Sequence, residues 1–253
     1  MSKNFELLQQ AGFGLGTAPT SRTWEKSAAT ERVRSASSEV LSSLEPAVRE
    51  ETLKLVQRLF LTREEVAPKA VMFAPIDTHG GCGWLCSVTA KLLAKSVPGS
   101  VCVVEGNLRS PSLSDNFGVE GDRGLVDSLE QGGPVRQFAR SIGPDNLWLL
   151  SAGATVQDSK MLVNSDRLRE RLGELREDFD YLVVNAPPLG AFADGMVLGR
   201  MVDGVVLVLE EETTRREAAV RVTEGLRNSR IPVLGAVLNN RTFPIPAAVY
   251  KRL

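Results

Sequence analysis

Short runs of aliphatic residues alternate with segments of helical periodicity from about residue 46 to residue 238. Several of these runs are continuous in valine and leucine, which is typical of parallel strands covered on both faces. We predict strands at 69–74, 100–105, 146–150, 180–185, 204–209 and 232–238, and helices at 46–61, 84–94, 160–177 and 213–228. This alternation predicts an α/β protein with a doubly wound, mostly parallel sheet. The expected apolar positions of the last two helices are Leu162, Leu168, Leu172, Leu175, Val220, Val222 and Leu226.

Residues 1–45 differ in composition from the rest of the chain. From Thr20 to Ser43 the chain is rich in serine, threonine, alanine and charge, and Trp24 is the one aromatic residue there. Such a segment buries too little apolar surface to offset the entropy lost on ordering. We therefore expect a weakly ordered N-terminal extension or linker at 1–45 and an α/β domain at 46–253, led by the helix at 46–61. A phosphorylated regulatory tail is the alternative interpretation of the extension.

A glycine-rich turn follows the first predicted strand and leads into a helix. It runs Ile76-Asp77-Thr78-His79-Gly80-Gly81-Cys82-Gly83. A helix that begins after such a turn offers a phosphate unpaired N–H groups and a positive dipole end. The usual P-loop pattern adds a lysine for the β- and γ-phosphates and a hydroxyl for magnesium. When this pattern is aligned on the predicted helix, Cys82 takes the place of the lysine and Gly83 takes the place of the hydroxyl residue. The phosphate-binding turn therefore lacks its positive charge.

Composition narrows the class of protein. The net charge of −1 gives no basic excess, so we expect no nucleic-acid partner. Three cysteines in 253 residues argue against a disulfide framework and for a reducing cytoplasm. Cys82 and Cys86 have helical spacing, but with His79 as the single histidine we expect no metal site. The chain begins without the apolar core of a signal peptide and holds no apolar run of bilayer length, so a membrane role would require a membrane partner.

Three further segments accompany the turn. They are Val103–Leu113, with Glu105-Gly106-Asn107-Leu108-Arg109 after the second predicted strand; Asp180–Pro188, which ends Val184-Asn185-Ala186-Pro187-Pro188; and Leu234–Asn239. Taken in this order with the turn, they resemble the bacterial tyrosine kinase (BY-kinase) family of capsular and exopolysaccharide assembly. That family lies within the ParA/MinD-like P-loop ATPases, and the resemblance covers roughly residues 45–253.

The resemblance implies where the family's functional residues fall in this chain. Its phosphate lysine falls on Cys82, and its magnesium hydroxyl falls on Gly83. Its second acidic motif falls on Glu105 and Asn107, and its Walker B aspartate falls on Asn185. We therefore expect a degenerate nucleotide site at Gly80, Gly81, Cys82, Gly83, Trp84, Glu105, Asn107, Arg109, Asn185 and Asn239, where Asn239 matches the adenine-side asparagine.

These departures all affect phosphoryl transfer, which depends on positioning and on neutralising phosphate charge. Neutral amide oxygens at Asn107 and Asn185 are poor substitutes for carboxylates around a hard cation. The family's tyrosine-rich tail is also missing, because Tyr181 and Tyr250 are the only tyrosines. We therefore expect no intact catalytic residue and no bound cofactor.

The function that follows is a non-catalytic, kinase-like regulator of exopolysaccharide polymerisation or export. By resemblance, it would be cytoplasmic and would be recruited to the inner membrane by a chain-length-determinant (polysaccharide co-polymerase) protein. The alternative is an active ATP-dependent tyrosine autokinase of the same pathway, which would need ATP and magnesium. A ParA/MinD-like positioning ATPase fits worst, because the loop-entry lysine of that group falls on Asp77.

Several residues keep two interpretations. Trp84 either stacks on a base or packs and plugs the phosphate pocket, and we favour packing. Cys82 is either an activated thiolate or a small residue that fills the vacated loop, and we favour the latter. Arg109 binds an anion or forms a surface ion pair. A homo-oligomer is compatible with the resemblance, but the family's oligomerisation motif is matched only loosely, because Lys54 and Gln57 replace arginines.

Overall fold

The computed structural model describes residues 44–62, 67–78, 81–143, 146–153 and 166–239. The expected N-terminal extension, the histidine at 79, Gly80, Leu162 and Tyr250 lie outside these residues, apart from positions 44 and 45 of the extension. No helix in the described ranges is long and apolar enough to cross a bilayer.

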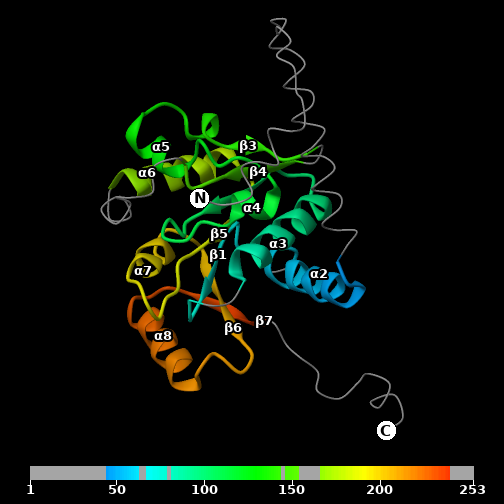
Figure 1. Ribbon diagram of the computed structural model, residues 1–253, viewed down its shortest axis with the longest axis vertical. Helices are drawn as coiled ribbons and strands as arrows, with labels where there is room; N and C mark the ends of the chain where they lie inside the picture. Colours follow the sequence, from blue (N-terminus) through cyan, green and yellow to red (C-terminus); the bar gives the residue numbers. More distant parts are fainter. Residues whose placement is uncertain (1–43, 63–66, 79–80, 144–145, 154–165, 240–253) are drawn as a thin grey trace, which may run out of the picture.

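In the part of the chain that the structure describes, seven strands form one sheet (Figure 1). They are β1 (Ala70–Pro75), β2 (Val101–Glu105), β3 (Arg140–Ser141), β4 (Leu147–Leu150), β5 (Tyr181–Asn185), β6 (Gly204–Glu210) and β7 (Val233–Asn239). The order across the sheet is β3-β4-β2-β5-β1-β6-β7. All neighbouring strands are parallel except β3 and β4. The six predicted strands are confirmed within one residue at each end, whereas β3 was not predicted, because its two exposed residues carry no hydrophobic pattern.

Helices cover both faces of the sheet, which confirms the doubly wound fold. One face is packed by α2 (Pro46–Phe60), α3 (Cys82–Ser96) and α4 (Leu113–Phe117). The other is packed by α5 (Leu125–Glu130), α6 (Asp166–Asp178), α7 (Asp194–Gly199), α8 (Arg216–Asn228) and the 3-10 turn η1 (Val135–Gln137). The two groups lie to the right and left of the sheet in Figure 1. The central strands are therefore buried on both sides.

The predicted helices differ from the structure mainly at their ends. The leading helix ends at Phe60 rather than at residue 61. The helix after the glycine turn begins at Cys82, two residues earlier than predicted, because Gly81 takes the left-handed conformation that ends the turn (φ 55°). The predicted helix at 160–177 is observed from Asp166, and its earlier part lies outside the described residues. The last helix begins at Arg216 because residues 211–214 form a turn, in which the Thr214 hydroxyl accepts a hydrogen bond from Glu210 N.

The apolar residues that indicated the last helix are not all buried in the structure. Val220 is 47% exposed, whereas Val222 and Leu226 on the same helix are buried. The short helices α4, α5 and α7 were also missed, because five or six residues are too few to show a helical period.

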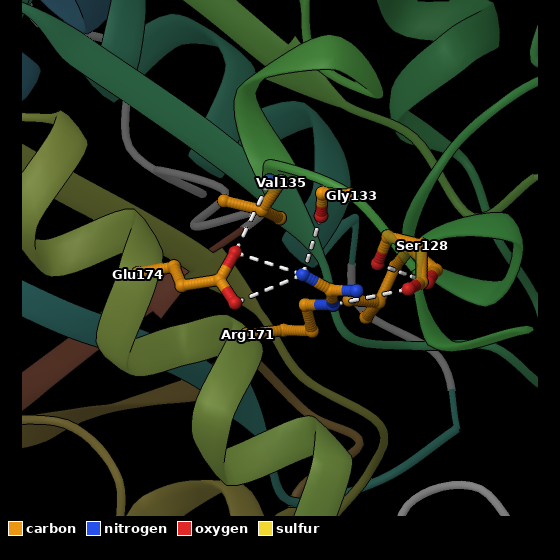
Figure 2. A network of polar contacts seen from close by, with 6 residues as sticks. Ser128, Gly133, Val135, Arg171 and Glu174 are labelled. Carbon is orange, nitrogen blue, oxygen red and sulfur yellow. Dashed lines mark hydrogen bonds and ion pairs between the residues drawn. The ribbon is translucent and has the colours of Figure 1, made fainter. Parts of the chain in front are cut away.

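An arginine on α6 joins that helix to the segment between α5 and η1 (Figure 2). Arg171 donates to the backbone oxygens of Ser128 (3.0 Å) and Gly133 (2.7 Å). It also pairs with Glu174 at 2.8 Å, and Glu174 accepts a hydrogen bond from Val135 N. These contacts provide hydrogen-bond partners for the carbonyl groups of Ser128 and Gly133 and for the N–H group of Val135. They therefore hold α5 and η1 in place against α6.

Candidate functional site

The glycine turn lies at the carboxyl edge of the sheet. Strands β1, β2, β5 and β7 run parallel, so the residues that end them meet at one edge, where α3 begins. Gly81 directly precedes α3, and no side chain caps the start of that helix. The carbonyl oxygen of Gly81 accepts a hydrogen bond from Leu85 N. Asn239 ends β7 close by, since a Cβ placed on Gly81 would lie 3.3 Å from Asn239 Nδ2. The predicted order of strand, turn and helix is therefore present, with Gly80 outside the described residues.

Cys82 is the first residue of α3 and its side chain is buried. Its thiol donates to the backbone oxygen of Phe73 on β1, with 3.4 Å between sulfur and oxygen. The side chain is thus directed into the protein rather than outward over the turn. This is the arrangement of a small residue that fills space.

Gly83 lies against the segment that precedes α4. A Cβ placed on Gly83 would overlap the hydroxyl oxygen of Ser112 and would lie 3.2 Å from Asn116 Nδ2. Two polar groups therefore occupy the space that a side chain at this position would need. Sequence reasoning missed both residues: Ser112 lies within the Val103–Leu113 segment but was given no role there, and Asn116 lies beyond that segment.

Glu105 is a buried carboxylate with four hydrogen-bond donors. Its Oε2 accepts from the backbone N–H groups of Ser112 (2.8 Å) and Leu113 (2.9 Å). Its Oε1 accepts from Asn107 N (3.1 Å) and from Asn185 Nδ2 (2.7 Å). Glu105 is only 1% exposed. The carboxylate thus holds the start of α4 and the end of β5, and both of its oxygens are already acceptors.

Burial raises the pKa of Glu105 to about 7, although the four donors act in the opposite direction. Removing a carboxylate from water disfavours its charged form, whereas donors aimed at its oxygens favour it. Near neutral pH the site therefore gains or loses one proton at a buried position. The proton would have to take the place of one of the four donors.

Two of the three asparagines of the predicted site, Asn107 and Asn185, contact this carboxylate. Asn185 is 1% exposed, and its Oδ1 lies 3.9 Å from the sulfur of Cys86, which donates to it. Burial raises the pKa of the Cys86 thiol well above its usual value, so the thiol keeps its proton and remains a donor. Asn107 approaches Glu105 through its backbone, and its side-chain oxygen accepts from Ser110 N at 3.3 Å. Glu105, Asn107 and Asn185 therefore form one connected polar group, the Glu105 network.

Two other predicted residues lie outside this network. Arg109 forms an ion pair with Asp194 at the start of α7, with Nε and Nη2 each 2.7 Å from Oδ2. Its guanidinium also lies 4.2 Å from the centre of the Phe192 ring. The ion-pair interpretation of Arg109 thus describes the structure, although Asp194 was not predicted as its partner. Trp84 is partly buried and packs against the core on the α3 face, and its position relative to a nucleotide stays a prediction.

A cavity of 660 Å³ adjoins the loop after β1. Asp77 lines it together with Arg215 and Arg221 of the α8 region. Its other walls include Leu189, Met196 and Val222. Neither Cys82 nor the Glu105 network lines this cavity, so it is separate from the position of the missing lysine. Within the described ranges, no cluster of three histidine, cysteine or acidic residues is arranged to hold a metal ion.

Comparisons with known proteins agree with this topology. The chain is similar to tyrosine-protein kinase YwqD of Bacillus subtilis, with 28% identity over 56% of this chain and 60% of that protein. It is also similar to the putative tyrosine-protein kinase CapB of Staphylococcus aureus, with 26% identity over 58% of this chain and 65% of that protein. The matches thus span less than two thirds of either relative's length. No protein-family model matches the chain.

Solved structures show the same fold. The kinase domain of Escherichia coli tyrosine kinase Etk has a TM-score of 0.70 and 21% identity, covering 79% of each chain. The chimerical protein CapA2B2 has a TM-score of 0.71 and 17% identity, covering 77% of this chain and 85% of that one. The MinC:MinD complex of Aquifex aeolicus has a TM-score of 0.57 and 20% identity, covering 73% of this chain and 72% of that one. The chain is therefore a homologue of the bacterial tyrosine-protein kinases and has the P-loop, MinD-like fold of their kinase domains.

Proposed function

We propose that this chain is a non-catalytic, kinase-like regulator of exopolysaccharide polymerisation or export. It works by docking on a membrane chain-length-determinant protein from the cytoplasmic side. The pathway, the location and the partner rest on the family resemblance. The loss of catalysis rests on the arrangement of the site.

The observation that carries this proposal is the Glu105 network. A magnesium ion needs oxygen ligands with free lone pairs, and carboxylates serve it best. Both oxygens of Glu105 already accept two hydrogen bonds each, and the amide nitrogen of Asn185 is turned toward that carboxylate. Magnesium would have to displace donors that hold α4 and the end of β5 in place. The residues present therefore do not fit the ion in this arrangement.

The glycine turn supports the same conclusion. A lysine gives the P-loop its grip on the β- and γ-phosphates, and this chain has a buried thiol there. A serine or threonine gives it a magnesium ligand, and this chain has Gly83 packed beneath Ser112. What remains for a phosphate is the start of α3, which supplies backbone N–H groups without a full charge.

The tyrosine in the described chain is a poor phosphate acceptor. Tyr181 begins β5 and packs edge-on against Phe60 of α2, with ring centres 6.0 Å apart. A kinase substrate must bring its hydroxyl to the γ-phosphate of a bound nucleotide. Tyr181 lies at the amino end of its strand, opposite the edge that carries the glycine turn.

An autophosphorylation assay tests the proposal. We expect no incorporation of phosphate from labelled ATP with magnesium at Tyr181 or Tyr250. Kinase activity that is lost when Gly81 is changed to valine would contradict the proposal and establish the autokinase alternative. An active kinase of the family should be assayed in parallel as a positive control. If that kinase incorporates phosphate and this chain does not, the absence of labelling is a property of this chain.

A further inference from the structure

The two edges of the sheet are built in different ways (Figure 1). The edge strand β3 has two residues, runs antiparallel to β4, and carries the charged Arg140. The edge strand β7 has seven residues and, within the described part of the chain, pairs only with β6. A very short, charged edge resists further strand pairing, whereas a long apolar edge offers unpaired N–H and C=O groups to another strand. Within the described ranges, the β7 edge is neither short nor charged.

Exposed apolar side chains gather at the same edge. Val233, Leu234 and Leu238 of β7 expose 38%, 37% and 47% of their surface. Among the described residues, five large apolar side chains are this exposed, and these are three of them. A fourth is Val220 of α8, the helix that precedes β7. Apolar residues concentrated in this way mark a surface that another chain covers.

The outer side of α8 carries a stripe of residues around Val220. Arg216, Val220 and Glu224 follow each other at intervals of four, so they share one side of the helix. Ala219 and Thr223 lie between them and are small. A groove of 300 Å³ runs along this α8 stripe, which consists of Arg216, Ala219, Val220, Thr223, Glu224 and Arg227. Neither Arg216 nor Glu224 belongs to an ion pair formed within the described residues.

This stripe is complementary to itself. When two copies of a helix pack antiparallel about a central residue, the residue four before the centre faces the residue four after it. With Val220 at the centre, Arg216 of one copy lies opposite Glu224 of the other, and the same pair forms a second time across the two-fold axis. The small residues Ala219 and Thr223 beside Val220 allow the two helices to approach closely. A two-fold interface requires this kind of self-complementary surface.

We propose that β7 and the α8 stripe form a homodimer interface. The two β7 strands pair antiparallel, so the sheet continues from one copy to the other, and the two α8 helices pack beside that junction. Strand pairing satisfies the backbone groups of the open edge, and the contact covers Val220 and Leu238. The inference goes beyond the proposed function and does not depend on it, because no nucleotide takes part.

Sedimentation velocity on the full chain without nucleotide tests this interface. We expect a concentration-dependent dimer. Arg216→Glu and Glu224→Arg should each weaken it by about tenfold, because each places like charges opposite one another twice. The double variant should restore dimerisation, since the exchanged charges face each other again. Rescue cannot arise within one helix, because residues eight apart are separated by about 12 Å.

Two further variants distinguish this interface from non-specific hydrophobic association. Leu238→Lys should abolish the dimer, because it puts a charge on the open edge strand. Leu61→Lys replaces another exposed apolar residue, which lies at the end of α2 and is 40% exposed, and should leave the dimer unchanged. A chain that stays monomeric at every concentration would overturn the proposal. A dimer that is insensitive to the charge exchange would overturn it as well. Either result would leave the kinase assay unaffected, so the two proposals fail separately.

Discussion

The side-chain amide of Asn185 donates a 2.7 Å hydrogen bond to Oε1 of Glu105, and both residues are 1% exposed. The two residues are register partners at the ends of β5 and β2. An amide can make this contact because it carries donors, whereas a carboxylate at the same position could only repel the ionised Glu105. The pair therefore holds two strand ends together without a cation.

We predict that Asn185→Asp destabilises the protein. Two buried carboxylates at this distance cannot both ionise, and Glu105 would lose a donor. The free energy of unfolding should fall by about 3 kcal/mol at pH 8. The loss should shrink toward pH 5.5, where one carboxyl group takes up a proton. Urea denaturation at the two pH values measures both effects.

The matched control is Asn228→Asp, which makes the same chemical change at an exposed residue that ends α8. We expect it to change stability by a few tenths of a kcal/mol at either pH. Equal losses in the free energy of unfolding for the two variants would mean that the contact between Glu105 and Asn185 does not contribute to stability, which would contradict the prediction. A gain in stability on adding magnesium to Asn185→Asp would show that one substitution rebuilds a cation site.

Glu105 predicts a pH dependence of stability. Its pKa is about 7 in the folded protein and near 4.5 when unfolded, so the folded state holds the proton more tightly. Stability should therefore fall as pH rises from about 4.5 to about 7, with a slope of at most about 1.4 kcal/mol per pH unit. Glu105→Gln removes this titration, so its stability profile should be flatter over the same range. Parallel profiles for the two proteins would contradict the assignment.

Gly83→Ser tests whether Ser112 has taken the space of the missing hydroxyl. Serine is a better helix former than glycine, so an unobstructed exchange should stabilise α3 by about 0.5 kcal/mol. We expect a loss instead, because the new Cβ would overlap the Ser112 hydroxyl. Ser112→Gly in the same chain should recover most of that loss, and thermal unfolding of the single and double variants gives the coupling.

Gly173→Ser on α6 is the control for this series. A Cβ at Gly173 meets nothing within 4 Å, so the substitution should be neutral or stabilising. If Gly83→Ser behaves like Gly173→Ser, the position is open and a magnesium hydroxyl could be restored there.

The sequence predicted the sheet well because its strands are continuous aliphatic runs that burial on both faces requires. The family resemblance implied that Glu105, Asn107 and Asn185 belong to one site, and the parallel pairing of β2 with β5 brings the strand ends that carry them together. The sequence could not predict that Glu105 would accept the first N–H groups of α4, because that helix has only five residues and no readable period. The exposure of Val220 could not be predicted for a related reason: spacing identifies a helix, but it does not decide which of the apolar side chains on that helix is buried. The contact of Arg109 with Asp194 joins residues 85 positions apart, which no local pattern reveals.

Lys91 is a buried cation that the proposed function does not use. It is 3% exposed, its Nζ has no hydrogen-bond partner within the described structure, and it lies 4.6 Å from the centre of the Phe117 ring. Burial lowers its pKa to about 8. We predict that Lys91→Met raises the free energy of unfolding at pH 7 by about 1–3 kcal/mol, because a buried charge is replaced by an apolar group of similar length.

The same variant should remove a second pH effect. The unfolded lysine keeps its proton up to its usual pKa of 10.5, whereas the folded one loses it near 8, so wild-type stability should rise between those values. Lys95→Met, near the exposed end of the same helix, should change neither quantity. A destabilised Lys91→Met protein would show instead that the contact with Phe117 outweighs the cost of burial.

Calorimetric titration of ATP into the full chain, with and without magnesium, tests the central claim most directly. The site has a buried thiol in place of the P-loop lysine, and Glu105 is fully hydrogen-bonded. We therefore expect no heat of binding at millimolar nucleotide. The protein should also show no gain in melting temperature, whereas a ligand at 100 times its Kd would add about 2.7 kcal/mol of stability. Magnesium-dependent binding that disappears in Gly81→Val would contradict the account and show that the P-loop holds nucleotide without its lysine.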